Sequence, residues 1–273
     1  MTDELMAKYA ELKRYIASLG SVAVAFSGGV DSTLLLFAAK EALGNKAMAV
    51  TLSSALVPER ETSEAATYCR QAGVKQIVVE FDELEIEGFA QNPPNRCYLC
   101  KKEIFGKICE VAAQEGMAHV IEGSNLDDEG DFRPGMQAIA ELGVESPLRH
   151  AGLTKQEIRD LSKHFGLPTW NKPSFACLAS RFPYGDAISR DKLRMVDRAE
   201  QLLLELGFAQ VRVRIHGDLA RIELMPKDFP RFMEDAMRAK VYDAFKEYGF
   251  AYVSLDIRGY RTGNMNDAVS DQA

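Results

Sequence analysis

The most constraining feature of the sequence is an apolar stretch at residues 22–26 that runs straight into a glycine-containing turn. Five small or β-branched apolar residues are typical of a buried strand. Gly28 and Gly29 follow at once and allow a sharp turn and a close backbone approach to a ligand. Residues 31–43 are predicted to form a helix, whose first N–H groups would face an anion. The sequence therefore predicts an anion-binding turn between a strand and a helix.

The motif itself is Ser27-Gly28-Gly29-Val30-Asp31-Ser32. It lacks the Lys-Ser/Thr pair of a Walker A loop and the spacing of the GxGxxG dinucleotide motif. It resembles the PP-loop, the pyrophosphate-binding turn of ATP pyrophosphatases. That resemblance implies cleavage of ATP between its α and β phosphates, with Ser27, Gly28, Gly29, Asp31 and Ser32 as nucleotide-binding residues. An ordinary glycine-rich turn is the plainer alternative.

Composition limits the classes of protein to consider. The 273 residues are 47% hydrophobic, enough for one large or two ordinary domains. No apolar run approaches the ~20 residues that span a bilayer, and the N-terminus does not resemble a signal peptide, so we expect a cytoplasmic protein without a membrane partner. The net charge of −7 argues against a nucleic-acid partner. Five cysteines, an odd number, favour thiol or metal chemistry over disulfides.

The first two thirds of the chain alternate between strands and helices. Strands are expected at 22–26, 47–52, 76–81 and 119–122, which indicates an α/β fold with a parallel sheet and helices on both faces. Ligands bind at the carboxyl ends of such strands. The polar turn at residues 123–128 follows the fourth strand, so Ser124 and Asp127 are candidate nucleotide-binding residues. A solvated turn is the alternative.

The pattern changes after residue 185. Helices are expected at 191–206 and 229–248, and strands at 211–215, 220–224 and 251–257. We therefore predict two domains: residues 1–185, a Rossmann-like domain of the adenine nucleotide alpha hydrolase type that carries the PP-loop, and residues 186–273, a smaller α+β domain. Arg212 and Arg214 alternate along one strand, so they share one face of it and could hold a phosphate.

Three further stretches make the resemblance specific: residues 172–185, 211–217 and 255–261. With the PP-loop they resemble the LarE family of ATP-dependent sulfur transferases, over nearly the whole chain. The resemblance implies that a carboxylate of pyridinium-3,5-biscarboxylic acid mononucleotide is adenylated, with release of pyrophosphate. A cysteine at the position of Cys177 then displaces AMP, and in the simplest members its sulfur passes to the product. The product is a precursor of the nickel-pincer cofactor of lactate racemase.

Other roles follow from the same resemblance. Mg²⁺ would bridge the ATP phosphates, with Asp31 as a ligand. Arg181, four residues after Cys177, would favour the thiolate, and Arg212 and Arg214 would bind the substrate phosphate. Glu129 and Arg133 would lie near the substrate. The resemblance also implies a symmetric homo-oligomer, with a hexamer as one form.

The source of the sulfur has three interpretations. Cys97, Cys100 and Cys177 resemble the LarE subgroup that is thought to bind a 4Fe-4S cluster through three cysteines, which leaves one iron open for an extra sulfide. Without a cluster, Cys177 would give up its own sulfur. A zinc site would need a fourth ligand such as His119 or His150.

Two rival functions stay open. A PP-loop enzyme of tRNA thiolation would need a surface that binds RNA, and an adenine-nucleotide sensor without catalysis would not need Cys177. Other residues receive plain interpretations: Cys69 and Cys109 as buried small hydrophobes, and His216 as a turn residue. Glu200 and Glu223 could be metal ligands but also suit ordinary helix and strand surfaces.

Overall fold

The computed structural model describes residues 2–128, 134–173 and 175–261. Contacts divide the chain into two compact units. Unit 1 contains residues 1–82 and 95–175, and unit 2 contains residues 83–94 and 176–273. Compact units need not coincide with domains, so the predicted domain boundary after residue 185 stays a prediction. Glu129 and Arg133 lie outside the described residues.

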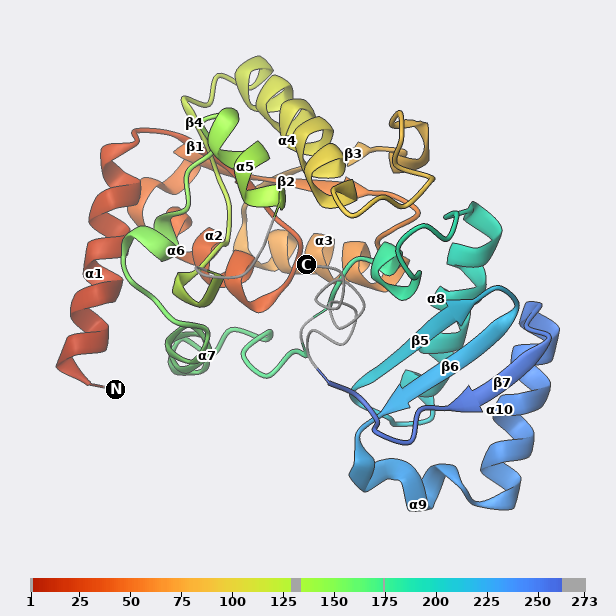
Figure 1. Ribbon diagram of the computed structural model, residues 1–273. Helices are drawn as coiled ribbons and strands as arrows, with labels where there is room; N and C mark the ends of the chain where they lie inside the picture. The colour runs from red at the N-terminus through yellow and green to blue at the C-terminus, as the bar shows by residue number, and fades with distance from the viewer. Residues whose placement is uncertain (1, 129–133, 174, 262–273) are drawn as a thin grey trace. The chain divides into compact units, whose positions relative to one another are not determined.

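Unit 1 is built on a four-stranded parallel sheet, as predicted (Figure 1). Its strands lie in the order β3-β2-β1-β4. They are β1 (Val22–Ala25), β2 (Ala47–Ser53), β3 (Lys75–Glu80) and β4 (His119–Ile121). Because β1 pairs with β2 on one side and β4 on the other, the chain reverses its direction of winding at β1. Such a point in a parallel sheet is where ligands bind.

Helices cover both faces of this sheet. They are α1 (Asp3–Ser18), α2 (Val30–Leu43), α3 (Glu59–Ala72), α4 (Arg96–Gln114), α5 (Pro134–Glu141), α6 (Pro147–His150) and α7 (Lys155–His164). Alternate residues of β1 point to opposite faces: Val22 and Val24 join one core cluster with α1, α2 and α7, while Ala23 joins the other with α4 and α5. This two-sided burial explains the continuous apolar run of β1. A capping box of Thr154 and Glu157 begins α7.

Unit 2 contains a smaller mixed sheet in the order β5-β6-β7. Its elements are α8 (Arg190–Glu205), β5 (Val211–His216), β6 (Leu219–Leu224), α9 (Phe229–Phe232), α10 (Asp235–Tyr248) and β7 (Tyr252–Leu255). β5 and β6 form the predicted antiparallel hairpin, and β7 pairs with β6 in parallel. The prediction of a single helix at 229–248 is wrong in one respect: the segment forms two helices, because Glu234 has extended backbone angles and separates α9 from α10.

The two faces of the small sheet differ in character. Val213 is paired with Ile222, and both are fully buried on the apolar face. On the other face Arg212 lies opposite Glu223, and Arg214 lies opposite Arg221. The fold thus places a charged layer on one side of the hairpin. Among the described residues, no helix combines the length and apolar composition needed to cross a membrane.

Candidate active site

The PP-loop lies at the carboxyl end of β1, where the sequence predicted it. Gly28 has a φ of +69°, in the left-handed region that favours glycine. A Cβ added there would come within 3.2 Å of the Ala65 Cβ atom in α3. Ser27 and Ser32 place their hydroxyls 3.1 Å apart, and the Ser32 hydroxyl also donates to the Gly29 carbonyl. The loop is therefore a compact turn whose backbone and close contact with α3 favour glycine at position 28.

The first turn of α2 leaves backbone donors at the loop. Gly29 is the N-cap of α2 and has no side chain to cap the helix. The first N–H groups of a helix have no acceptor within the helix, and the helix dipole adds positive potential there. Asp31, Ser32 and their neighbours thus supply N–H groups of the kind that hold a phosphate.

The end of β4 packs against this loop. A Cβ added at Gly123 would approach both the Asp31 Cβ atom and the Ser32 nitrogen to 3.2 Å, so the two backbones are in close contact. Asn125 donates through its side-chain amide to Asp31 (3.3 Å). Asp127, which is exposed, accepts from the backbone N–H of Lys155 at 2.8 Å. The structure therefore brings the polar turn after β4 to the PP-loop.

Ser124 and Lys155 make further polar contacts in the region of the loop. Ser124 is buried, and both its backbone N–H and its hydroxyl donate to the Glu122 carboxylate, at 3.0 and 2.8 Å. Lys155, which sequence reasoning missed, forms an ion pair with Asp31. Lys155 is the first residue of α7, and its partner lies 124 positions earlier in the chain, so no local spacing could have revealed the pair.

In unit 2, arginine side chains bind the backbone around Cys177. Cys177 is exposed and directly precedes the short helical turn η4 (Leu178–Arg181). Arg181 donates through one terminal nitrogen to the carbonyl oxygens of Ala176 (2.7 Å) and Cys177 (3.3 Å). Arg214 donates to the carbonyl oxygen of Ser180. Two arginines that the sequence analysis selected as site residues thus bind the main chain next to Cys177, the predicted nucleophile.

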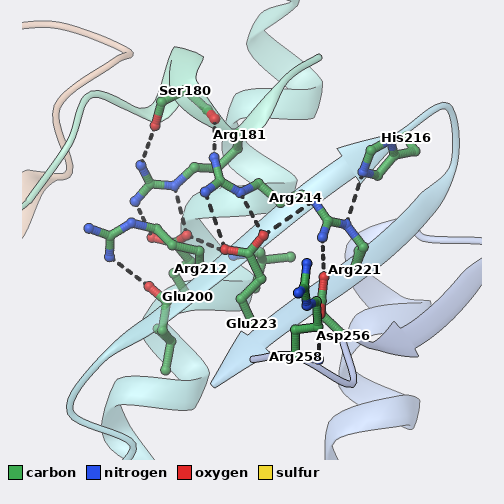
Figure 2. A network of polar contacts seen from close by, with 12 residues as sticks. Ser180, Arg181, Glu200, Arg212, Arg214, His216, Arg221, Glu223, Asp256 and Arg258 are labelled. Atoms are coloured by element: carbon green, nitrogen blue, oxygen red, sulfur yellow. Dashed lines mark hydrogen bonds and ion pairs between the residues drawn. The ribbon is translucent and has the colours of Figure 1, made fainter. Parts of the chain in front are cut away.

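Both arginines are neutralised by buried carboxylates, as Figure 2 shows. Arg181 is fully buried and makes two hydrogen bonds of 2.8 Å to Glu200, which is itself 2% exposed. Arg214 makes the equivalent pair with Glu223 at 3.1 and 3.2 Å. The described residues thus give Glu200 and Glu223 the role of counter-ions to arginine.

The network continues along the charged face of the hairpin (Figure 2). Arg221 bridges Glu223 (3.2 Å) and Asp256, and its Nε donates to His216 Nε2 at 3.2 Å. Burial, and then the charge of Arg221, lower the pKa of His216. His216 at the end of β5 is therefore an acceptor for an arginine.

Arg212 is the most desolvated cation of this face. It is 7% exposed, donates to the Val211 carbonyl oxygen (2.7 Å), and lies 5.2 Å from the centre of the Tyr260 ring. Burial, and then repulsion from Arg181, lower its pKa. A cation held in this way gains from binding an anion.

The other cysteines fall into two groups. Cys69 is buried, and burial raises its pKa to about 11; burial also raises the pKa of Cys109. The prediction that Cys69 is a buried small hydrophobe is confirmed, and Cys109, partly buried, packs against the second core cluster. Cys97, exposed, and Cys100, partly exposed, lie in the first two turns of α4 at a spacing of three, which places them on one side of the helix. Within each unit, no three described His, Cys, Asp or Glu side chains are arranged to hold a metal ion.

The fold and the loop define an α/β nucleotide-binding protein of the PP-loop class. The model of the NAD synthase family matches residues 5–98, which contain this loop. A Synechocystis protein described as uncharacterized is 41% identical over 96% of this chain and 98% of its own length. The GMP synthase of Aeropyrum pernix is 29% identical over 66% of this chain and 38% of its own length.

A more specific match covers both units. The pyridinium-3,5-bisthiocarboxylic acid mononucleotide synthase of Lactiplantibacillus plantarum is 37% identical over 97% of this chain and 96% of its own length. The chain belongs to the family of this synthase, the LarE family of the PP-loop superfamily.

Proposed function

We propose that the protein is an ATP-dependent sulfurtransferase that converts the two carboxylates of pyridinium-3,5-biscarboxylic acid mononucleotide to thiocarboxylates, as a step toward the nickel-pincer nucleotide of lactate racemase. The observation that carries the proposal is the match of both units to the Lactiplantibacillus plantarum synthase. A PP-loop alone would fit many ATP-using enzymes, whereas the match extends through Cys177 and the arginines of unit 2.

The first step makes a poor electrophile reactive. A substrate carboxylate oxygen attacks the α-phosphorus of ATP, and the bond to the β-phosphate oxygen breaks, which gives an acyl adenylate and pyrophosphate. The N–H groups at the start of α2 and the hydroxyls of Ser27 and Ser32 would hold the departing pyrophosphate. Mg²⁺ usually binds through one or two carboxylates and the substrate phosphates. Asp31 at the loop fits this description, and Mg²⁺ would neutralise charge on the leaving pyrophosphate.

The second step is attack by sulfur. The thiolate of Cys177 would attack the acyl carbon and expel AMP, which leaves a thioester. Breaking the bond between Cβ and sulfur, with loss of the Cα proton, gives the thiocarboxylate and dehydroalanine. Cys177 suits this role because its side chain is exposed, and the contacts of Arg181 and Arg214 around it support a fixed backbone. Arg212 and Arg214 would bind the phosphate of the mononucleotide.

The alternative sulfur source is a sulfide carried by a 4Fe-4S cluster on Cys97, Cys100 and Cys177. The soft donor set and the shared helical side of Cys97 and Cys100 fit two of its ligands. When bound, such a cluster would supply a sulfide without loss of protein sulfur. We favour the cluster over the sacrificial route, and zinc is the third interpretation.

Two coarser features complete the proposal. The protein would act in the cytoplasm as a symmetric homo-oligomer. Its free cysteines support the cytoplasmic location, because disulfides are rare there. Its partners would be ATP and the pyridinium mononucleotide, without nucleic acid or membrane. A tRNA thiolation enzyme and a nucleotide sensor are the competing functions.

The test measures pyrophosphate release by the purified protein with ATP and the pyridinium dicarboxylate. We expect release that depends on the dicarboxylate, and we expect Cys177→Ala to keep it while losing thiocarboxylate formation. Release with tRNA but not with the dicarboxylate would favour the thiolation enzyme, and nucleotide binding without release would favour a sensor. Mass spectrometry of the chain after turnover, with iron and sulfide analysis of anaerobically purified protein, separates the sulfur sources: loss of the mass of H₂S at Cys177 means sacrifice.

A further inference from the structure

Lys172 is a largely buried cation beside the PP-loop that neither the motif nor the proposed chemistry accounts for. Its side chain is 16% exposed, and its ammonium has three acceptors. Two are the carboxylates of Glu61 (2.8 Å) and Glu64 (2.6 Å) in α3. The third is the backbone carbonyl oxygen of Gly28, at 3.2 Å. One side chain therefore joins α3, the PP-loop and the segment that precedes Cys177.

The contact with Gly28 bears on the conformation of the loop. The carbonyl of Gly28 belongs to the peptide unit that carries the N–H of Gly29, so fixing the oxygen on Lys172 fixes the direction of that N–H. Because Gly28 is a glycine with a φ of +69°, its backbone can adopt several conformations, and this peptide unit keeps one orientation only if something holds it. Burial by itself would lower the pKa of Lys172, but the hydrogen bonds that its ammonium donates to Glu61 and Glu64 outweigh burial and raise the pKa, which keeps the ammonium charged.

The segment around Lys172 is itself anchored from two sides. Arg159 of α7 donates to the carbonyl oxygens of Trp170 and Lys172, both at 2.9 Å. Arg60 of α3 lies over the ring of Phe175, 5.7 Å from its centre. Cys177 follows Phe175 by two residues. Within unit 1, the segment that carries Lys172 therefore contacts α7, α3 and the PP-loop.

We infer that Lys172 is a positioning residue that holds the PP-loop in its pyrophosphate-binding shape and couples occupancy of the loop to the order of residues 169–173. The inference rests on the proposed function, because it assumes that the loop binds pyrophosphate. It predicts reciprocity: pyrophosphate would order the segment, and disordering the segment would weaken pyrophosphate binding.

The test compares wild type with Lys172→Met in the full chain. Calorimetric titration with inorganic pyrophosphate and, separately, AMP should show pyrophosphate binding weakened about tenfold, the usual worth of a hydrogen bond to a charged group. AMP, which does not need the pyrophosphate cradle, should change less than about twofold on the same reasoning. Lys40→Met is the matched control, since Lys40 of α2 also donates to a backbone carbonyl, that of Gly73 at the end of α3, and does not contact the loop residue Gly28.

Hydrogen exchange separates positioning from a simple loss of charge. In wild type, pyrophosphate should slow exchange in residues 26–33 and also in residues 169–173. In Lys172→Met the apo loop should exchange faster, and pyrophosphate should no longer protect residues 169–173. Weakened binding with unchanged exchange would mean that Lys172 contributes only charge, and equal losses for pyrophosphate and AMP would mean general damage; either overturns the inference. Absence of pyrophosphate binding by wild type would overturn the proposed function as well.

Discussion

Substitution of Glu200 offers the sharpest test of how unit 2 supports Cys177. Glu200→Gln keeps the shape of the side chain but removes the charge that neutralises Arg181, which has no exposed surface. The carboxylate accepts two hydrogen bonds from Arg181 and one from the Val213 N–H, each at 2.8 Å. Removing one partner of a buried ion pair costs about 3–5 kcal/mol, because the remaining charge stays desolvated. We expect unit 2 to be destabilised by that amount.

Urea unfolding followed by two probes measures the effect. Trp170, the single tryptophan, lies in unit 1, so its fluorescence reports on that unit, while far-UV circular dichroism reports on both. The two transitions should separate in Glu200→Gln, with the helical signal lost at lower urea. Glu205→Gln, at an exposed position of the same helix, should change stability by less than about 0.5 kcal/mol. A Glu200→Gln protein as stable as this control would refute the argument.

A double substitution then separates folding from positioning. Replacing a buried ion pair by apolar residues of similar size is often neutral or stabilising. Arg181→Met with Glu200→Leu should therefore recover part of the lost stability, although the Val213 N–H loses its acceptor Glu200. The double substitution also removes the donors to the Ala176 and Cys177 carbonyl oxygens. We expect a folded protein that forms the adenylate but transfers sulfur slowly.

The remaining predictions concern the loop, the hairpin and the proposed cluster. Gly28→Ala should lower stability by roughly 1–2 kcal/mol and weaken pyrophosphate binding in calorimetry, because its φ is +69° and Ala65 is close; unchanged binding would contradict the cradle. Because the folded-state pKa of His216 is depressed, the unfolded chain binds more protons, so stability should fall as pH drops below about 6.5. His216→Gln should flatten that part of a urea-midpoint-against-pH curve, and an unchanged slope would assign it to other groups. Cys97→Ser should lower iron and sulfide content after anaerobic purification, whereas equal iron in both proteins would exclude Cys97 as a ligand.

The core of unit 1 was predictable from local pattern. A continuous apolar run, two glycines and a helix-forming stretch specify β1, the PP-loop and α2, and alternation of such elements specifies a parallel sheet. The short helices α5 and α6 were missed because Pro134, Gly135 and Pro147 resemble loop signals. The break at Glu234 was missed because periodicity does not record one extended residue between two helices.

The site was predictable only where its residues are close in sequence. Alternation along β5 placed Arg212 and Arg214 on one face, and the structure agrees. The ion pairs that Glu200 and Glu223 make with the arginines of unit 2 could not be predicted. They depend on the packing of α8 and the pairing of β6, which sequence spacing does not encode. The same holds for Lys172, whose partner Glu64 is 108 positions away.

The contacts of Arg181 bear on how the sulfur becomes reactive. Its Nε and one terminal nitrogen bind Glu200, and the other binds Ser180 and the carbonyl oxygens of Ala176 and Cys177. A guanidinium already paired with a buried carboxylate offers little net charge to a nearby thiolate. This arrangement favours a positioning role for Arg181 over direct activation of the thiol. Activation would then come from the other reactant, since adenylation turns an inert carboxylate into a mixed anhydride with AMP as its leaving group. On this reasoning ATP cleavage at the PP-loop would supply the driving force, and the arginines of unit 2 would position the backbone around Cys177.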